Sequence, residues 1–291
     1  MSVLALALLA ASAFASPEVK LIARSHRPGE AVLVAVSGHH LERAPSGALA
    51  GRALSFFPGA PGVFLALGGL DLELSTGAHR VELTLWEADG RRHLWSSDLM
   101  VRERKFPTVN LRVEAKFVHP PKAEDERAER EGRMQRAIFD TATPKRHLTG
   151  RFHAPIKGAP SSRFGERRLF NGVPRAPHSG ADLRARAGTP VSASEAGEVS
   201  FAGDLFFGGK TVILDHGYGV FSSYSHLSEI LVEAGKLVTR GARVGKVGAT
   251  GRVTGPHLHW GVKLQGARVD PFSVMALELD PWLSAPAASV R

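Results

Sequence analysis

The sequence predicts an all-β protein with an N-terminal β-sandwich, a linking helix and a second, antiparallel β domain. Short apolar runs broken by Gly and Pro fill residues 17 to 118. Charged helix formers occupy residues 120 to 140, and short β-like runs return in a Gly-rich background from about residue 150. With 291 residues, 43% of them hydrophobic, the chain is long enough for two domains with their own cores.

The first fifteen residues, MSVLALALLAASAFA, have the features of a secretory signal peptide. They form an uncharged apolar run that ends in small residues, with Ala13 and Ala15 in the pattern that signal peptidases cut. The run is too short to span a membrane, so we expect an exported protein, periplasmic or secreted, without a transmembrane segment. Because no Lys or Arg precedes the run, an uncleaved anchor is a weaker alternative.

The chain is basic and lacks cysteine. Its 37 Lys and Arg residues against 28 Asp and Glu residues give a net charge of +9. This balance favours a polyanionic surface, which is nucleic acid, an acidic membrane or the anionic bacterial cell wall. For an exported protein we expect the anionic cell wall, and no nucleic acid. Without Cys there is neither a disulfide nor a lipoprotein-type Cys anchor.

Residues 16 to 118 are predicted to form an immunoglobulin-like sandwich, because five runs in them suit half-buried strands. The run NLRVEAKFV (110 to 118) is either the last strand of this sandwich or a strap onto the next domain. The five runs are VKLIA (19 to 23), EAVLVAVSG (30 to 38), GVFLALGG (62 to 69), HRVELTLWEADG (79 to 90) and HLWSSDLMV (93 to 101).

Residues 119 to 149 are predicted to be a linker that contains an exposed, charged helix. The stretch PPKAEDERAEREGRMQRAIFD (120 to 140) opens on a Pro pair and continues with helix formers. Its charges pair at i, i+4, with Glu126 opposite Arg130 and Glu129 opposite Arg133. The interleaved acidic residues favour a solvated face over a nucleic-acid-binding arm.

The second domain is predicted to span residues 150 to 275, with a tail of residues 276 to 291 that carries no motif. Strands are expected in TPVSASEAGEVSFAG, KTVILDHGYGVFSSYSHL, KLVTRGARVGKVGATG and PHLHWGVKL. The sequence GGKT (208 to 211) does not indicate a phosphate-binding loop. Asp204 stands where that loop requires Gly, and β-rich sequence follows where a helix is needed.

Two histidines, His257 and His259, stand one residue apart in the apolar stretch GPHLHWGV. On a strand they point to one side, and Leu258 points to the other side, into a core. Two partly buried imidazoles do not both stay protonated cheaply, so we expect one of them to bind a cation as a neutral ring.

A second cluster, PHSGADL (177 to 183), supplies His178 and Asp182, which are ligand types that zinc prefers. Gly180 and the preceding VPRAP favour a loop that enters a strand. Together with one ring of the His-x-His pair, these residues give three protein ligands. Three ligands on tetrahedral zinc leave one position for water or substrate, which is typical of a catalytic site. His226, in SSYSHLSEI, adds an acid–base or charge-stabilising group beyond the ligands.

The set HSGAD, YSHL and TGPHLHWGV, in that order, closely resembles the LytM or lysostaphin-type zinc metallopeptidases, peptidase family M23, which cut peptidoglycan cross-links. SSRFGERR (161 to 168) and GARVGKVGATGRVTGPHLHW add to the likeness, which covers roughly residues 150 to 272. The resemblance implies a LytM-type, barrel-sandwich-like β domain. It also implies that His178, Asp182 and His259 are the zinc (Zn2+) ligands and that His226 and His257 are the two catalytic, non-ligand histidines.

The resemblance further implies a zinc-dependent endopeptidase that acts on the peptide stems of peptidoglycan, and we expect the protein to be a monomer. It favours a D-Ala-type bond over a glycine bridge. A non-enzymatic peptidoglycan-binding or amidase-activating protein is the alternative, because some family members have lost zinc ligands. A polyanion-binding module, the third hypothesis, explains none of the histidines. His216 is expected to be structural, and the N-terminal sandwich to be a targeting or regulatory domain that covers the groove.

Overall fold

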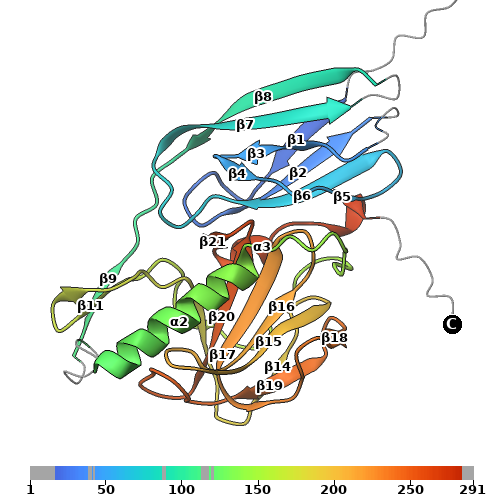
Figure 1. Cartoon of the computed structure of the whole chain (residues 1–291). Coiled ribbons are helices and arrows are strands. Elements are labelled where there is room, and N and C mark those ends of the chain that lie inside the picture. Colours follow the sequence, from blue (N-terminus) through green and yellow to red (C-terminus); the bar gives the residue numbers. More distant parts are fainter. Residues whose placement is uncertain are drawn as a thin grey trace, which may run out of the picture.

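Strands dominate the computed structural model, which describes residues 17–38, 41, 43–86, 90–112, 118 and 121–283. The all-β prediction is therefore confirmed (Figure 1). Residues 1 to 15, the expected signal peptide, and residues 284 to 291 of the expected tail lie outside the described residues. Among the described residues, no helix is both long and apolar enough to cross a membrane.

The N-terminal region is a sandwich of two four-stranded antiparallel sheets, ordered β1-β2-β6-β5 and β4-β3-β7-β8. This is the strand order of an immunoglobulin-type sandwich, as predicted. The five expected runs became β1, β2, β6, β7 and β8, while three short strands between them were not predicted. The strands are β1 (Glu18–Ile22), β2 (Ala31–Ser37), β3 (Ser46–Leu49), β4 (Arg52–Ala53), β5 (Phe57–Pro58), β6 (Val63–Gly69), β7 (Gly77–Trp86) and β8 (Arg92–Val101).

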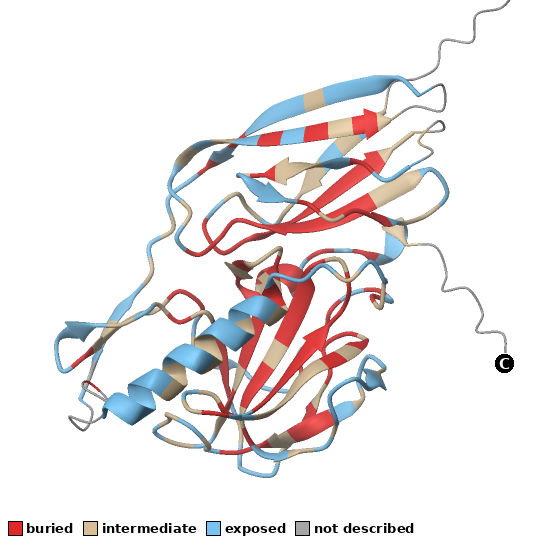
Figure 2. Ribbon diagram, in the orientation of Figure 1, coloured by how far each residue is buried: buried red, intermediate tan, exposed pale blue. Residues whose placement is uncertain are grey.

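Strand β2 is buried on both of its faces, because alternate side chains belong to different cores. Val32, Val34 and Val36 pack inside the sandwich. Leu33 and Ala35 instead join a second core whose other members lie mainly in the C-terminal domain. The sheet β1-β2-β6-β5 therefore separates two hydrophobic cores, which Figure 2 shows as a continuous buried stretch along β2.

The segment that connects the two domains, called the linker below, contains strand β9 (Thr108–Leu111), which lies in the range predicted for the sandwich, and helix α2 (Lys122–Phe139), which lies in the predicted linker. Strand β9 pairs in parallel with β11 (Arg167–Phe170) of the C-terminal domain. Of the two alternatives for residues 110 to 118, the strap is thus the observed one for β9, and residues 113 to 117 lie outside the described residues.

Helix α2 is mostly exposed, as expected, although its last residue, Phe139, is buried. Glu129 pairs with Arg133 at 3.8 Å, which was predicted. Glu126 pairs with Lys122 at 3.9 Å and not with Arg130.

The C-terminal domain is built on a ten-stranded antiparallel sheet whose main path is β10-β13-β20-β17-β16-β15-β18. Strands β14 and β19 pair with each other, β19 also pairs with β17, and β21 pairs with β20. The elements are β10 (Pro160–Ser162), β12 (Val173–Pro174), β13 (Gly180–Arg184), β14 (Pro190–Ser192), β15 (Gly197–Leu205), β16 (Gly209–Asp215), β17 (Val220–Ile230), β18 (Leu237–Val238), β19 (Arg243–Val247), β20 (His257–Leu264), β21 (Ala267–Val269), α3 (Pro271–Met275) and a 3-10 turn η1 (Asp280–Trp282).

The sandwich packs on the end of the C-terminal sheet where β20 turns into β21 (Figure 1). Polar contacts add to the shared core at this junction. Arg268 donates to Asp71 at 2.6 Å, and Arg24 and Arg104 each donate to Asp270 at 3.1 Å. The histidines of β20 lie at the start of the strand, so the strand runs from the candidate site to the sandwich.

Candidate metal centre and cleft

Three adjacent strands of the C-terminal sheet position the five predicted site residues. His178 lies in the turn before β13, and Asp182 lies in β13. Strand β20 carries His257 and His259 and is hydrogen-bonded to β13 on one side and to β17 on the other. The register sets His259 opposite Asp182, which neither residue's local sequence could indicate.

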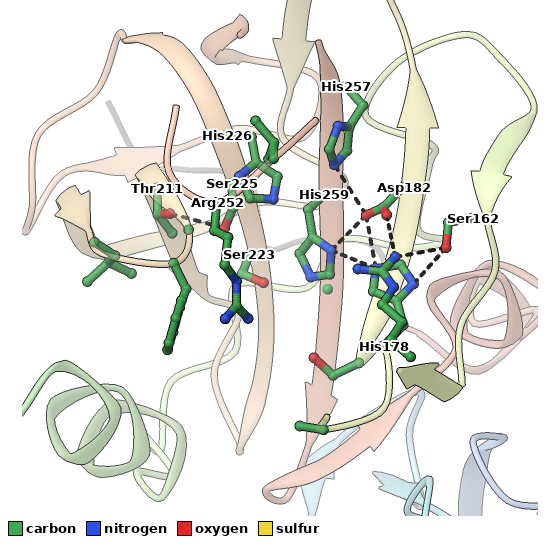
Figure 3. Close-up of a pocket in the computed structure, with 18 of the residues that line it drawn as sticks. Ser162, His178, Asp182, Thr211, Ser223, Ser225, His226, Arg252, His257 and His259 are labelled. Atoms are coloured by element: carbon green, nitrogen blue, oxygen red, sulfur yellow. Dashed lines mark hydrogen bonds and ion pairs between the residues drawn. The ribbon is translucent and has the colours of Figure 1, made fainter. Parts of the chain in front are cut away.

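The His-x-His pair has the predicted orientation. Leu258 and Trp260 are fully buried in the core, whereas His257 and His259 are partly exposed on the opposite face of the strand. Alternation on β20 therefore turns both imidazoles into the same space (Figure 3).

His226 reaches this space through an irregular backbone. Tyr224 of β17 is buried, and Ser225 lines the cleft, so regular alternation would turn His226 away from it. The backbone φ of His226 is instead 65°, in the left-handed region, and its N–H donates to the carbonyl of Gly208 at 2.7 Å. This break in alternation brings Ser225 and His226 to the same cleft. A left-handed non-glycine residue costs about 1 to 2 kcal/mol, so the surrounding structure must hold it in place.

His178, Asp182 and His259 form a tight cluster of possible metal ligands. Asp182 Oδ1 lies 2.9 Å from His178 Nε2 and 2.9 Å from His259 Nδ1, and the two ring nitrogens are 3.0 Å apart. Ligand atoms about 2.0 to 2.1 Å from a tetrahedral zinc ion are about 3.3 Å from one another. The three atoms therefore fit one cation after an outward movement of a few tenths of an ångström, and two imidazoles with one carboxylate suit zinc.

The ionisation of the cluster also suits a cation. Burial raises the pKa of the Asp182 carboxyl, but hydrogen bonds from His178 and His259 outweigh that effect and hold the pKa well below its usual range. Burial lowers the pKa of His259 despite the contact with Asp182. A charged carboxylate and a neutral imidazole are the forms in which these side chains bind metals.

The two other predicted site histidines, His226 and His257, each have one ring nitrogen hydrogen-bonded to a backbone carbonyl. His226 Nδ1 donates to the carbonyl of Thr250 at 2.9 Å, and His257 Nδ1 donates to that of Gly255 at 2.9 Å. These bonds leave both Nε2 atoms as acceptors. The two ring centroids are 4.8 Å apart, and His257 Nε2 lies 3.7 Å from Asp182 Oδ1. Burial, with smaller effects of His259 and His257, lowers the pKa of His226 to about 3, so its ring is neutral.

The cluster opens into a cleft of about 1640 Å³ on this face of the sheet. Its floor follows β20 from His257 to Lys263, and the neighbouring face of β17 supplies Ser223 and Ser225. One wall comes from the linker, through Val109 and helix α2. Among the described residues, no lining residue belongs to residues 17 to 101 of the sandwich. The described sandwich therefore lies away from the groove that it was expected to cover.

Residues 176–271 match the model of peptidase family M23. A solved structure described as a candidate M23 peptidase from Pseudomonas aeruginosa is 32% identical with a TM-score of 0.66, over 87% of this chain and 95% of that chain. The chain belongs to peptidase family M23.

Two curated relatives of this M23 peptidase have names that state an activity. Peptidoglycan DD-endopeptidase ShyA of Vibrio cholerae serotype O1 is 42% identical over 121 residues, which are 41% of this chain and 28% of ShyA. DD-carboxypeptidase/endopeptidase Mpg of Neisseria meningitidis serogroup B is 43% identical over 97 residues, which are 33% of this chain and 22% of Mpg. The match thus spans about a quarter of the length of each relative.

His216 of this M23 peptidase lies apart from the cleft. It is fully buried, its Nδ1 donates to the carbonyl of Ala196 at 2.7 Å, and its Nε2 lies 2.8 Å from the hydroxyl of Ser222. These contacts agree with the expected structural part. Of the other histidines, none of those described lines the cleft, and His39, His40 and His119 lie outside the described residues.

Residues that the sequence analysis did not single out support the M23 cluster. Arg168 donates to Asp182 Oδ2 at 2.9 Å and to Ser162 Oγ at 2.9 Å, which orients the carboxylate. His178 Nδ1 lies 3.0 Å from the carbonyl oxygen of Arg163, and this contact turns Nε2 towards Asp182 and His259. Arg168 stands in the quoted segment SSRFGERR, but nothing local to that segment reveals its contact with Asp182.

Proposed function

We propose that the chain is a zinc-dependent endopeptidase that hydrolyses peptide cross-links of bacterial peptidoglycan. The observation that supports this most is the convergence of His178, Asp182 and His259 beside two further imidazoles at one end of a long cleft. A protein that only binds the wall has no need of all five side chains. The names of ShyA and Mpg agree with peptidoglycan as the substrate class.

We assign the zinc ligands as His178, Asp182 and His259. Their three converging donor atoms suit this ion, and Arg168 and the carbonyl of Arg163 hold two of the three ligands in place. When bound there, zinc would polarise a carbonyl group and lower the pKa of a water molecule towards about 7.

His226 and His257 are assigned as the catalytic histidines. Because Nδ1 of each ring is held by a backbone carbonyl, Nε2 of each is an acceptor in the cleft. One Nε2 takes the proton of the attacking water, and a protonated ring then donates to the leaving amine or stabilises the developing oxyanion. Water and the scissile peptide must therefore enter between the rings and the metal ligands.

The cleft suits an extended peptide, since its floor is an open strand face with small residues at Gly261, Ser223 and Ser225. We propose a D-Ala-type cross-link as the bond that is cut, and not a glycine bridge. The DD-endopeptidase name of ShyA supports this choice. A site of action in the cell wall, after export, is part of the same proposal.

The test is mass spectrometry of purified muropeptides after incubation with the full chain. We expect cross-linked dimers to become monomers, a chelator to stop the reaction and added zinc to restore it. His178→Ala should lose both bound zinc and hydrolysis. His153→Ala is a matched control, because His153 is exposed and lies outside the cleft. Hydrolysis by metal-free His178→Ala protein at the rate of the unchanged chain would exclude the proposed mechanism.

A further inference from the structure

The cleft contains an arginine that has no carboxylate counter-ion among the described residues. Arg252 lies in the loop between β19 and β20, and its guanidinium stacks 4.0 Å from the ring centre of Phe207 and 5.2 Å from that of Phe170. Figure 3 draws it on the Ser223 side of His259, with His178 on the other side. Within the described ranges, no carboxylate lies within ion-pair distance of this half-buried side chain.

A second arginine approaches the same phenyl ring. Arg175, which follows β12, has its guanidinium carbon 5.9 Å from the ring centre of Phe170. It donates one hydrogen bond to the backbone carbonyl of Val118. Its Nε is buried and has no hydrogen-bond partner among the described residues. A buried donor that lacks a partner is destabilising, and a bound anion would offset this cost.

The cleft as a whole carries excess positive charge. Its three carboxylates are engaged already, because Asp182 and Glu166 contact Arg168, and Glu131 contacts Arg127. Burial, together with the charges of Arg175 and Arg168, lowers the pKa of Arg252. These cations therefore repel one another in a partly desolvated site. The basic lining residues are Arg112, Arg168, Arg175, Arg184, Arg252 and Lys263.

We propose that Arg252 and Arg175 form a carboxylate-binding subsite, and that they hold a carboxylate of the wall peptide next to the scissile bond. This inference rests on the proposed function and adds a determinant of specificity to it. The planar guanidinium matches a carboxylate with two parallel hydrogen bonds, and stacking on Phe207 and Phe170 restricts its orientation before substrate arrives. Selectivity for carboxylate over carboxamide follows, because an amide supplies no charge to the paired arginines.

The experiment uses a soluble cross-linked stem-peptide dimer and analogues in which one carboxylate at a time is converted to a carboxamide. Amidation of an internal carboxylate and of the chain-end carboxylate are separate arms, which identify the group that the subsite holds. For the unchanged chain we expect one of these analogues to bind and react on the order of 10- to 100-fold less well, as for the loss of a charge-assisted hydrogen bond.

Arg252→Gln should weaken binding of the carboxylate form by the same factor, raise KM with little change in kcat, and abolish the preference over the amide. Arg252→Lys should retain part of the affinity, since lysine keeps the positive charge but cannot make the two parallel hydrogen bonds of a guanidinium. Arg243→Gln is the matched control, because Arg243 of β19 is exposed and does not line the cleft. Zinc content and the thermal midpoint show whether Arg252→Gln is folded. If it is not, Arg175→Gln provides the same test.

Calorimetric binding to the peptides separates this inference from the proposed function. Cleavage of all analogues at equal rates by the unchanged chain would overturn the subsite and leave the endopeptidase intact. Carboxylate-selective binding that Arg252→Gln removes, without any cleavage, would support the subsite and contradict the endopeptidase. If Arg252→Gln bound each peptide with the same affinity as the unchanged chain, the subsite would also be overturned.

Discussion

His257 shows how one side chain can be separated from its neighbours by experiment. It lies beside the ligand cluster, yet its Nδ1 is held by the carbonyl of Gly255 and its Nε2 is 3.7 Å from Asp182. We expect His257→Ala to keep zinc and to lose about 10²- to 10⁴-fold in kcat, the usual contribution of a general acid or base. Zinc content by atomic spectroscopy and turnover of muropeptides are the two measurements. Loss of zinc in this variant would make His257 a ligand.

His216 predicts how stability depends on pH. Burial lowers its pKa to about 4 in the folded protein, against 6.5 in the unfolded chain. Between these values the unfolded state binds more protons, so the stabilisation is present above pH 6.5 and is lost as the pH falls through 4. The loss amounts to about 3 kcal/mol for this group alone.

Urea unfolding of metal-free protein at pH 7, 5.5 and 4.5 would measure this loss. The variant His216→Gln should have a shallower pH dependence than the unchanged chain, whatever its stability at pH 7. Identical slopes for the two proteins would show that His216 is not the titrating group.

At the level of single residues, the sequence predicts to which face of a strand a side chain points, because side chains alternate between the two faces. The shared face of His257 and His259 follows from their spacing on a strand. The position of His226 depends on a left-handed residue inside β17, and that of Arg252 depends on a loop that packs on Phe207. The neighbouring residues do not indicate either position. His226 was therefore predicted from the family resemblance, and the position of Arg252 was found only in the structure.

At the scale of secondary-structure elements, the pairing of β13 with β20 places Gly180 in contact with His259. A methyl group at residue 180 would lie 2.5 Å from the carbonyl oxygen of Trp260 and 2.7 Å from Cε1 of His259. Real side-chain carbons do not come so close, so Gly180→Ala must displace the His259 ring or the strand. We expect its zinc affinity to fall about 10- to 100-fold, as when the support of a ligand is lost.

Competition with a fluorescent chelator would measure that affinity. Gly255→Ala is the control, because a methyl group there meets no atom within 4 Å. Unchanged zinc affinity in folded Gly180→Ala protein would mean that β13 and β20 can separate without disturbing the ligand.

The longer strands were predictable, whereas several short elements, including the five-residue helix α3, were not. The runs that became β1, β2, β6, β7 and β8 each show a periodic pattern, and the linking helix was expected close to its observed bounds. Strands of two to four residues, such as β4 and β5, are too short for any period to appear. The parallel pairing of β9 with β11 joins residues far apart in the chain, and local patterns carry no information about it.

At the scale of the whole molecule, the sandwich and the peptidase domain share a hydrophobic core. Leu33, Leu65 and Leu67 of the sandwich belong to the same cluster as Leu264 and Val269. We therefore expect one cooperative thermal transition for the full chain. Residues 145 to 291 alone should unfold at a lower temperature, because the separation exposes these apolar side chains to water.

Differential scanning calorimetry tests this expectation. Two separate transitions, one of them at the temperature of the isolated fragment, would contradict it. The same two proteins, assayed on soluble muropeptides, would test the targeting or regulatory hypothesis for the sandwich. That hypothesis now concerns the linker wall of the cleft, since none of the described residues of the sandwich lines it.

The junction at β20 and β21 also restricts how such a chain can evolve. A methyl group at Gly69 of the sandwich would meet Val269 at 2.6 Å and Ala267 at 2.8 Å, so each surface is shaped to the other. Recombination that exchanged this sandwich for an unrelated module would leave the peptidase half without its complementary partner. Exchange of either half alone would therefore require compensating changes on the other side of this contact.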